Sequence, residues 1–316
     1  MGAPKLRAAL YVLCYHEVRW SEPMHLRGLG ICHTPEMFGE HLEALSRLGT
    51  LVSYRDGLDR MRAGELTQPL FSVSFDDGYA GIVDHVLPTL DAIGVSALAA
   101  INPPFITGDA TFWRSKLCWI RRRGAIERLA VGLETLGYHS GSVRDFTMDN
   151  YSDELVGIID EVYESLADDD QARDRRSLHT GIDGLSALRA AGWELGNHSS
   201  RHLPLLESTA EDQLEAEFAE AEQWLATTVG AATTSWVAPF DRPLQRSASA
   251  VTSMRSLAGD RDCVLVGDRA TSVPDVEDGV IYRTFAPVGR TPALVAALKR
   301  ASRRSLQPTP HRAEPS

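Results

Sequence analysis

Apolar runs alternate with amphipathic segments along most of the chain. The apolar runs are short and bounded by turn residues, as in buried strands, and cover residues 8–15, 51–54, 70–75, 95–101, 193–196, 234–238, 263–266 and 280–285. Between them, helical spacing predicts helices at 35–48, 79–93, 182–191 and from about 291 onward. Strands separated by helices predict a mostly parallel sheet. We therefore expect an α/β fold, a distorted (β/α) barrel with about seven or eight strands and a long insertion.

Local signals mark the ends of several of these helices. Thr34 followed by Pro35 has the form of an N-cap and a first-turn proline, and glycines at 49, 94 and 192 follow three of the helices. The segment 208–211, STAE, has the form of a capping box. It predicts the start of a further helix whose apolar face carries Leu214, Phe218, Ala221 and Leu225.

Residues 102–181 interrupt the alternation of strands and helices. This segment is too long for a plain loop between a strand and a helix, and loops of that length are often lids or specificity elements. Its Trp113 and Trp119 would either stack on a sugar face or fill a small core of the insertion, and we favour the core. From about residue 303 the chain is rich in Arg, Pro and Ser, which predicts a disordered tail. We expect one domain over residues 1–302, with the insertion at 102–181 and the tail at 303–316.

Composition limits the classes of partner and compartment. The 316 residues include 32 basic and 43 acidic side chains, a net charge of −11, which argues against a nucleic-acid-binding protein. The four cysteines are scattered without a CxxC spacing, so we expect reduced thiols. No apolar stretch reaches the roughly 20 residues that span a bilayer. The apolar run near the N-terminus continues into Tyr15 without a small-residue cleavage site, so we interpret it as a strand and expect a cytoplasmic protein.

Two short motifs carry candidate chemistry. The segment 74–78, SFDDG, places Asp76 and Asp77 where a buried strand ends. His198 and His202 lie four residues apart, so a helical turn or a tight loop can direct both rings to one point. One carboxylate and two imidazoles suit zinc and related divalent ions, with coordination positions left for water and substrate. The remaining carboxylate is a candidate base, and the pattern predicts a metal-dependent hydrolase.

These motifs resemble those of the polysaccharide deacetylases with a NodB-like homology domain, carbohydrate esterase family 4. The segments 74–78 and 198–202 are similar to the family's [ST]-F-D-D-G and H-[ST]-x-x-H motifs. Residues 15–18, YHEV, and 236–240, WVAPF, are similar to the Y-H-x-[IV] and F-A-Y-P-[FY] segments of one branch.

The resemblance implies roles for individual residues of this chain. It implies that Asp76 is the general base and that the metal is held by Asp77, His198 and His202. A divalent ion, zinc by preference, would activate water and polarise the acyl carbonyl. The backbone N–H of Tyr79 is a candidate for stabilising the resulting oxyanion.

The chain departs from the family pattern at two points. No arginine occurs in the segment 236–239, where many members have one that orients the base. No late Leu-x-His is present either, because His311, in the expected tail, is the only histidine after the metal motif. His16, at the end of the first strand, is our candidate for the missing acid, although a histidine bonded to a buried carbonyl explains it equally well. Pro239 and Phe240 are candidate substrate contacts, with packing as the alternative.

The leading functional hypothesis is a deacetylase that hydrolyses the acetamide of an N-acetylated amino sugar or glycoconjugate precursor. A metal-dependent amidase or deformylase acting on a small metabolite is the alternative enzyme. A third hypothesis is a carbohydrate-binding relative that keeps the fold without turnover.

Overall fold

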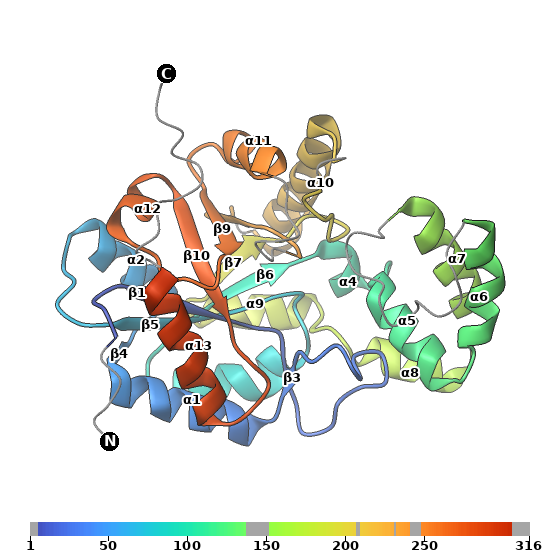
Figure 1. Cartoon of the computed structure of the whole chain (residues 1–316), viewed down its shortest axis with the longest axis horizontal. Helices are drawn as coiled ribbons and strands as arrows, with labels where there is room; N and C mark the ends of the chain where they lie inside the picture. Colours follow the sequence, from blue (N-terminus) through green and yellow to red (C-terminus); the bar gives the residue numbers. More distant parts are fainter. Residues whose placement is uncertain (1–5, 137–151, 207–208, 231, 241–247, 305–316) are drawn as a thin grey trace.

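A closed parallel barrel forms the centre of the molecule (Figure 1). The computed structural model describes all residues except 1–5, 137–151, 207–208, 231, 241–247 and 305–316. Seven strands follow one another around the barrel in the order β1 (Leu10–Tyr15), β10 (Val280–Phe285), β9 (Asp262–Val266), β8 (Ser235–Val237), β7 (Glu194–Asn197), β6 (Leu98–Ile101) and β5 (Leu70–Phe75). Pairing of β5 with β1 closes the ring, and the short β4 (Thr50–Leu51) pairs with the N-terminal end of β5. The predicted (β/α) barrel is confirmed.

The register of β1 brings two candidate site segments together. β1 pairs with β5 over its whole length, from Leu10 opposite Leu70 to Tyr15 opposite Phe75. Both strands therefore end at the same level, and the residues that follow them, His16 and Asp76, emerge at the same end of the barrel. This is the end formed by the carboxyl termini of the strands, where barrel enzymes place their sites.

Helices surround the barrel and bury its outer face (Figure 1). They include α1 (Pro35–Leu48), α2 (Tyr54–Arg62), α3 (Leu87–Asp91), α9 (Ile182–Ala190), α10 (Glu211–Trp224), α11 (Ala248–Ala258), α12 (Val273–Glu277) and α13 (Thr291–Arg304), with π-helical turns η1 (Ile82–Val86) and η4 (Leu225–Val229). The short strands β2 (Glu17–Val18) and β3 (Cys32–His33) pair beside the barrel. None of the helices in the described part of the chain has the length and apolar character needed to cross a bilayer.

The expected insertion is a helical unit at one side of the barrel, on the right in Figure 1. It comprises α4 (Pro103–Thr107), α5 (Trp113–Arg122), α6 (Ile126–Thr135), α7 (Asp153–Glu164) and α8 (Asp169–Arg176). Trp119 is fully buried in a core shared with Leu129, Leu155 and Tyr163, and Trp113 joins the same cluster. Both tryptophans therefore pack in the insertion's core, as we favoured from the sequence.

Several predicted boundaries are wrong. The strand expected at 51–54 ends at Leu51, and Tyr54 instead begins α2, whose apolar residues at 54, 58 and 61 have helical spacing. The helix expected from 79 begins only at Ile82, because Tyr79 and Ala80 instead pair with the segment 178–180. It opens with a π-helical turn, and Pro88 has no N–H to bond four residues back.

Two further expectations concern segments that are only partly described. The N-cap of α10 is Ala210, two residues after the serine of the predicted capping box at 208–211, and Ala210 makes no side-chain cap bond. Ser208 itself lies outside the described residues. Of the expected tail, 303 and 304 are the last residues of α13, and 305–316 lie outside the described residues.

Candidate metal centre and catalytic site

Two loops at the carboxyl end of the barrel carry the candidate metal ligands. Asp77 lies two residues after the end of β5, with a left-handed φ of 67°, and Gly78 continues the turn with φ of 63°. His198 follows β7, and its loop has left-handed backbone at Ser199 and His202, both with φ of 60°. Left-handed residues cannot continue an α-helix. Of the two arrangements open for the histidine pair, the structure therefore has the tight loop.

The three side chains converge on one point. Oδ1 of Asp77 lies 3.3 Å from Nε2 of His202 and 3.6 Å from Nε2 of His198. The two imidazole rings are nearly perpendicular, at 84°, with centroids 4.8 Å apart. All three residues are buried, and their possible ligand atoms lie within 4.8 Å of one another.

The donor atoms fit a divalent cation. Oδ1 of Asp77 is buried without a hydrogen-bond partner among the described residues, although two imidazole nitrogens face it. Nδ1 of His198 lies 2.9 Å from the carbonyl oxygen of Val237, so Nε2 is left as the lone-pair donor toward the site. Burial lowers the pKa of His198 to about 4, which favours the neutral imidazole that binds metal. Burial acts to raise the pKa of Asp77, but the nearby histidines, His202 above all, outweigh it and hold the carboxyl ionised.

Buried amides hold the histidine loop in place. Nδ2 of Asn102, directly after β6, donates to the carbonyl oxygens of His198 and Ser199 at 2.5 and 2.9 Å. Oδ1 of Asn197 accepts from the N–H of Ser199 at 3.0 Å. Because these bonds fix the backbone at His198 and at the residue after it, the direction of the His198 imidazole is set by strands β6 and β7.

Asp76 is held by an arginine that lies outside the segment 236–239. Arg283 on β10 is fully buried and donates from Nη1 to Oδ1 at 2.5 Å and from Nη2 to Oδ2 at 3.0 Å. Burial raises the pKa of Asp76, but Arg283 and the neighbouring histidines outweigh it, and the pKa falls to about 2. The arginine absent from 236–239 thus has a counterpart on β10. Its one sequence signal is a charged residue inside the apolar run VIYRTF.

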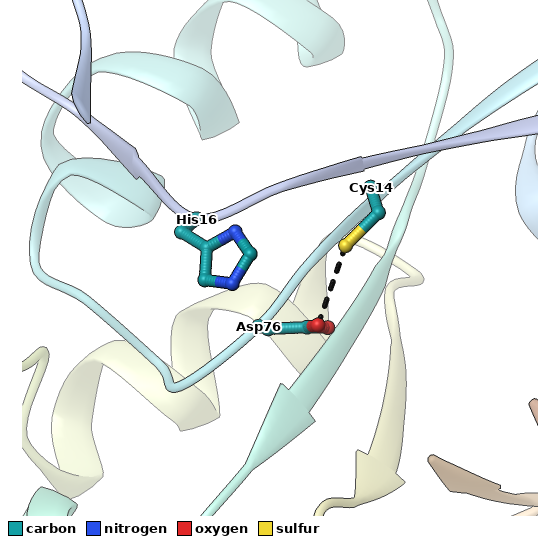
Figure 2. Close-up of side chains that lie close together, drawn as sticks. All are labelled: Cys14, His16 and Asp76. Atoms are coloured by element: carbon teal, nitrogen blue, oxygen red, sulfur yellow. Dashed lines mark hydrogen bonds between the residues drawn. The ribbon is translucent and has the colours of Figure 1, made fainter. Parts of the chain in front are cut away.

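His16 lies beside Asp76, with its ring directed toward the carboxylate (Figure 2). One ring nitrogen of His16, a carboxylate oxygen of Asp76 and the sulfur of Cys14 lie within 4.8 Å of one another. Nδ1 of His16 is buried and has no hydrogen-bond partner among the described residues, so the alternative of a carbonyl-bonded histidine is not observed for this atom. Burial lowers the pKa of His16, and the carboxylates of Asp76 and Asp77 act against that shift.

Glu17 anchors the segment that carries His16. Its Oε1 accepts from the N–H groups of Val18 and Gly81, both at 2.9 Å, and the side chain is fully buried. A Cβ atom at position 81 would lie 2.0 Å from Oε1, so the approach requires glycine there. Burial raises the pKa of Glu17 to about 7. The carboxyl group therefore ties the loop after β1 to the turn that follows Asp77.

Tyr79, the predicted oxyanion contact, lies in the turn after Asp77. The backbone bonds around Tyr79 run from Thr180 to Gly78 and from Ala80 to Leu178, which leaves the Tyr79 N–H outside that ladder. The Tyr79 side chain itself is buried and stacked on His179. His179 had no spacing signal in the sequence, yet its Nδ1 lies 2.9 Å from the backbone oxygen of Asp77.

Aromatic rings border the metal centre on the side of the insertion. The ring of Phe240 lies 4.3 Å from that of His202, and Phe112 of the insertion lies 4.9 Å from it. Pro239 is buried one residue before Phe240. The structure therefore brings Phe240 against a candidate metal ligand and adds Phe112, which the sequence analysis did not single out as a site residue.

Comparisons with known proteins agree with this site. The family model described as polysaccharide deacetylase matches residues 169–256, the segment that includes both histidines. The predicted resemblance to polysaccharide deacetylases is thereby confirmed, and the predicted enzyme class, a hydrolase of the deacetylase type, is the class of the matched family. No curated protein matches the sequence.

Solved structures share the fold at low sequence identity. The deacetylase PplD from Streptococcus pyogenes, in complex with acetate, is 13% identical with a TM-score of 0.57, over 92% of this chain and 98% of that one. IcaB from Ammonifex degensii is 16% identical with a TM-score of 0.57, over 94% of this chain and 100% of that one. A de-N-acetylase from Aggregatibacter actinomycetemcomitans is 12% identical with a TM-score of 0.56, over 92% and 99% of the two chains.

Proposed function

We propose that this protein is a metal-dependent deacetylase that hydrolyses the acetamide of an N-acetylated amino sugar or glycoconjugate precursor. The proposal rests on one observation: the candidate metal ligands and the candidate base lie side by side at one end of the barrel. Asp77, His198 and His202 form the candidate metal centre, and Asp76 lies beside it, 3.9 Å from Nε2 of His198. A carboxylate held ionised next to a metal centre is suited to amide hydrolysis by metal-activated water.

Each residue has a chemical task in this proposal. A divalent ion held by the three ligands would supply Lewis acidity at the acyl carbonyl and lower the pKa of water. Asp76 takes the proton from the attacking water, and the new C–O bond gives a tetrahedral oxyanion. The Tyr79 N–H is the candidate donor to this oxyanion. His16, which lies beside Asp76, delivers a proton to the amide nitrogen as the C–N bond breaks, and acetate and an amine leave.

We infer that zinc is the resident ion. Two neutral imidazoles and one carboxylate, with positions left for water and substrate, are a ligand set typical of catalytic zinc. Other divalent ions share this preference for nitrogen and oxygen donors, so metal analysis of the purified protein is the test.

The aromatic border supports a second candidate function. Phe240, Phe112 and Trp113 form a continuous set of ring contacts next to His202. Such a wall next to the metal centre suits a compact substrate as well as a sugar unit at the end of a chain. A metal-dependent amidase or deformylase on a small metabolite is therefore the alternative, with the same ligands and base.

One assay separates these functions. The zinc-loaded protein would be incubated with N-acetylated mono- and oligosaccharides, a nucleotide-linked N-acetyl sugar, and acetyl and formyl amides without a sugar, and released acetate or formate would be measured. The proposal is supported if the wild type releases acetate from the sugars, if Asp76→Asn no longer does so, and if the control His85→Asn still does. Turnover restricted to the amides without a sugar supports the alternative, and a protein that binds metal without turning over any substrate contradicts both. The cytoplasmic location remains a prediction.

A further inference from the structure

A buried thiol lies against the candidate base. Cys14 on β1 is 1% exposed, and its Sγ lies 3.3 Å from Oδ2 of Asp76, as the dashed line in Figure 2 shows. Residues 10, 12 and 14 share one face of β1 by the strand's period of two, and Leu10 and Val12 lie in the core inside the barrel. Cys14 thus extends this inner face to the point where the site begins.

The pairing of β1 places Cys14 between the strands that carry Asp76 and Arg283. Cys14 is opposite Ser74 on β5 and opposite Phe285 on β10. Burial raises the pKa of the Cys14 thiol well above its ordinary value, so the sulfur carries its proton and acts as a donor. The short contact to the carboxylate is therefore an S–H···O hydrogen bond.

The donors around Asp76 nearly fill its acceptor positions. An ionised carboxylate offers about four lone-pair sites. Arg283 occupies one on each oxygen, and Cys14 occupies a second on Oδ2. About one site remains, on Oδ1, and a base needs one free site for the proton that it takes from water.

We propose that Cys14 is a positioning residue for Asp76, whose S–H bond fixes the carboxylate so that one defined lone pair is left for the proton of the attacking water. This inference rests on the proposed function, in which Asp76 is the base. With Arg283 as its only donor, the Asp76 carboxylate could still rotate while keeping its two bonds to the guanidinium. The S–H donor of Cys14 on β1 prevents this rotation. The thiol acts through Asp76 and touches no substrate.

A second metal site is the competing explanation for the group of Cys14, His16 and Asp76, whose donor atoms lie within 4.8 Å of one another. The guanidinium of Arg283 argues against it, because it occupies both oxygens of Asp76 and repels a second cation. The thiol would also have to lose its proton beside a carboxylate, which raises its pKa further. The hydrogen bond accounts for the arrangement without a second ion.

The kinetic test compares Cys14→Ala, Cys14→Ser and the control Cys118→Ala, which removes another buried thiol from the insertion. We expect Cys14→Ala to lower kcat about tenfold with unchanged KM and metal content, as for loss of a hydrogen bond to a charged group. Cys14→Ser keeps a donor and should recover most of kcat, and Cys118→Ala should match the wild type. Equal kcat values for Cys14→Ala and Cys118→Ala would overturn the proposal. Two bound metal ions in the wild type, falling to one in Cys14→Ala, would overturn it in favour of the second metal site.

An infrared measurement tests the bond without activity. The difference spectrum of wild type minus Cys14→Ser isolates the S–H stretch of Cys14, which should lie at the low frequency of a hydrogen-bonded thiol and move to higher frequency in Asp76→Ala. A band already at the frequency of a free thiol in the wild type contradicts the inference. If no substrate is turned over, the proposed function fails, whereas the infrared result still decides whether Cys14 holds Asp76.

Discussion

Removal of Arg283 should strongly destabilise the protein, because it leaves the Asp76 carboxylate buried without its counter-charge. Both partners of this ion pair are buried: Arg283 is 0% exposed and Asp76 is 4% exposed. Loss of one partner of a buried, doubly bonded pair typically lowers the free energy of unfolding by about 3–5 kcal/mol. We expect Arg283→Met, which retains the bulk of the side chain, to fall in that range.

A double-mutant cycle separates the pair from the bulk effect of the substitution. Asp76→Asn alone leaves the guanidinium with a neutral partner, and Arg283→Met with Asp76→Asn removes both charges. Because the double variant has no unpaired charge, its loss of stability should be smaller than the sum of the two single losses by about 2 kcal/mol. Arg47→Met is the control: Arg47 pairs with Glu43, the two side chains are 65% and 73% exposed, and exposed pairs contribute about 1 kcal/mol or less.

Urea unfolding in the presence of a chelator gives the four free energies without a contribution from metal binding. The reasoning is refuted if Arg283→Met loses no more stability than Arg47→Met, or if the two single losses add within about 0.5 kcal/mol. Either result would mean that the two side chains do not form the buried pair.

Three further predictions concern the base, the acid and the anchor of the acid. Asp76→Asn should keep its metal and fold and lose turnover by a factor of about 10² to 10⁴; loss of the metal would show that the two aspartates have each other's roles. His16→Ala should lower kcat with metal retained and remove the fall in rate at high pH, because a proton donor is lost as pH rises through its pKa; an unchanged pH profile argues against His16 as the acid. Folding raises the pKa of Glu17 from 4.5 to about 7, so the protonated carboxyl group stabilises the folded protein. This contribution to the free energy of unfolding, about 3 kcal/mol, is fully present below pH 4.5 and is lost as the pH rises to about 7. Glu17→Gln should flatten that part of the stability profile in urea unfolding, and an equally steep profile in the variant would contradict the assignment.

The sequence was most informative where local pattern and fold agree. The apolar runs at 70–75 and 280–285 match β5 and β10 residue for residue, because strands buried on both faces need continuous apolar sequence. The short spacings between Asp76 and Asp77 and between His198 and His202 predicted side chains that the structure brings to one point. These relations are local, or follow from strands that end at a common barrel face.

The sequence was least informative where long-range register decides contact. Arg283 lies 207 residues from Asp76, and only the pairing of β1 with both β5 and β10 brings them together. Cys14 reaches the same carboxylate for the same reason, 62 residues away. Spacing along the chain carries no signal for such pairs. A buried charge within an apolar strand does carry one, because it must find a partner.

Metal content, measured with acetate release on the same samples, tests the central claim most directly. The wild type should carry about one divalent ion per chain, zinc by preference, and release acetate from N-acetylated sugars. Asp77→Ala, His198→Ala and His202→Ala should each lose most of the metal and the activity, while His85→Asn keeps both. Retention of wild-type metal in all three ligand variants would contradict the assignment of the site.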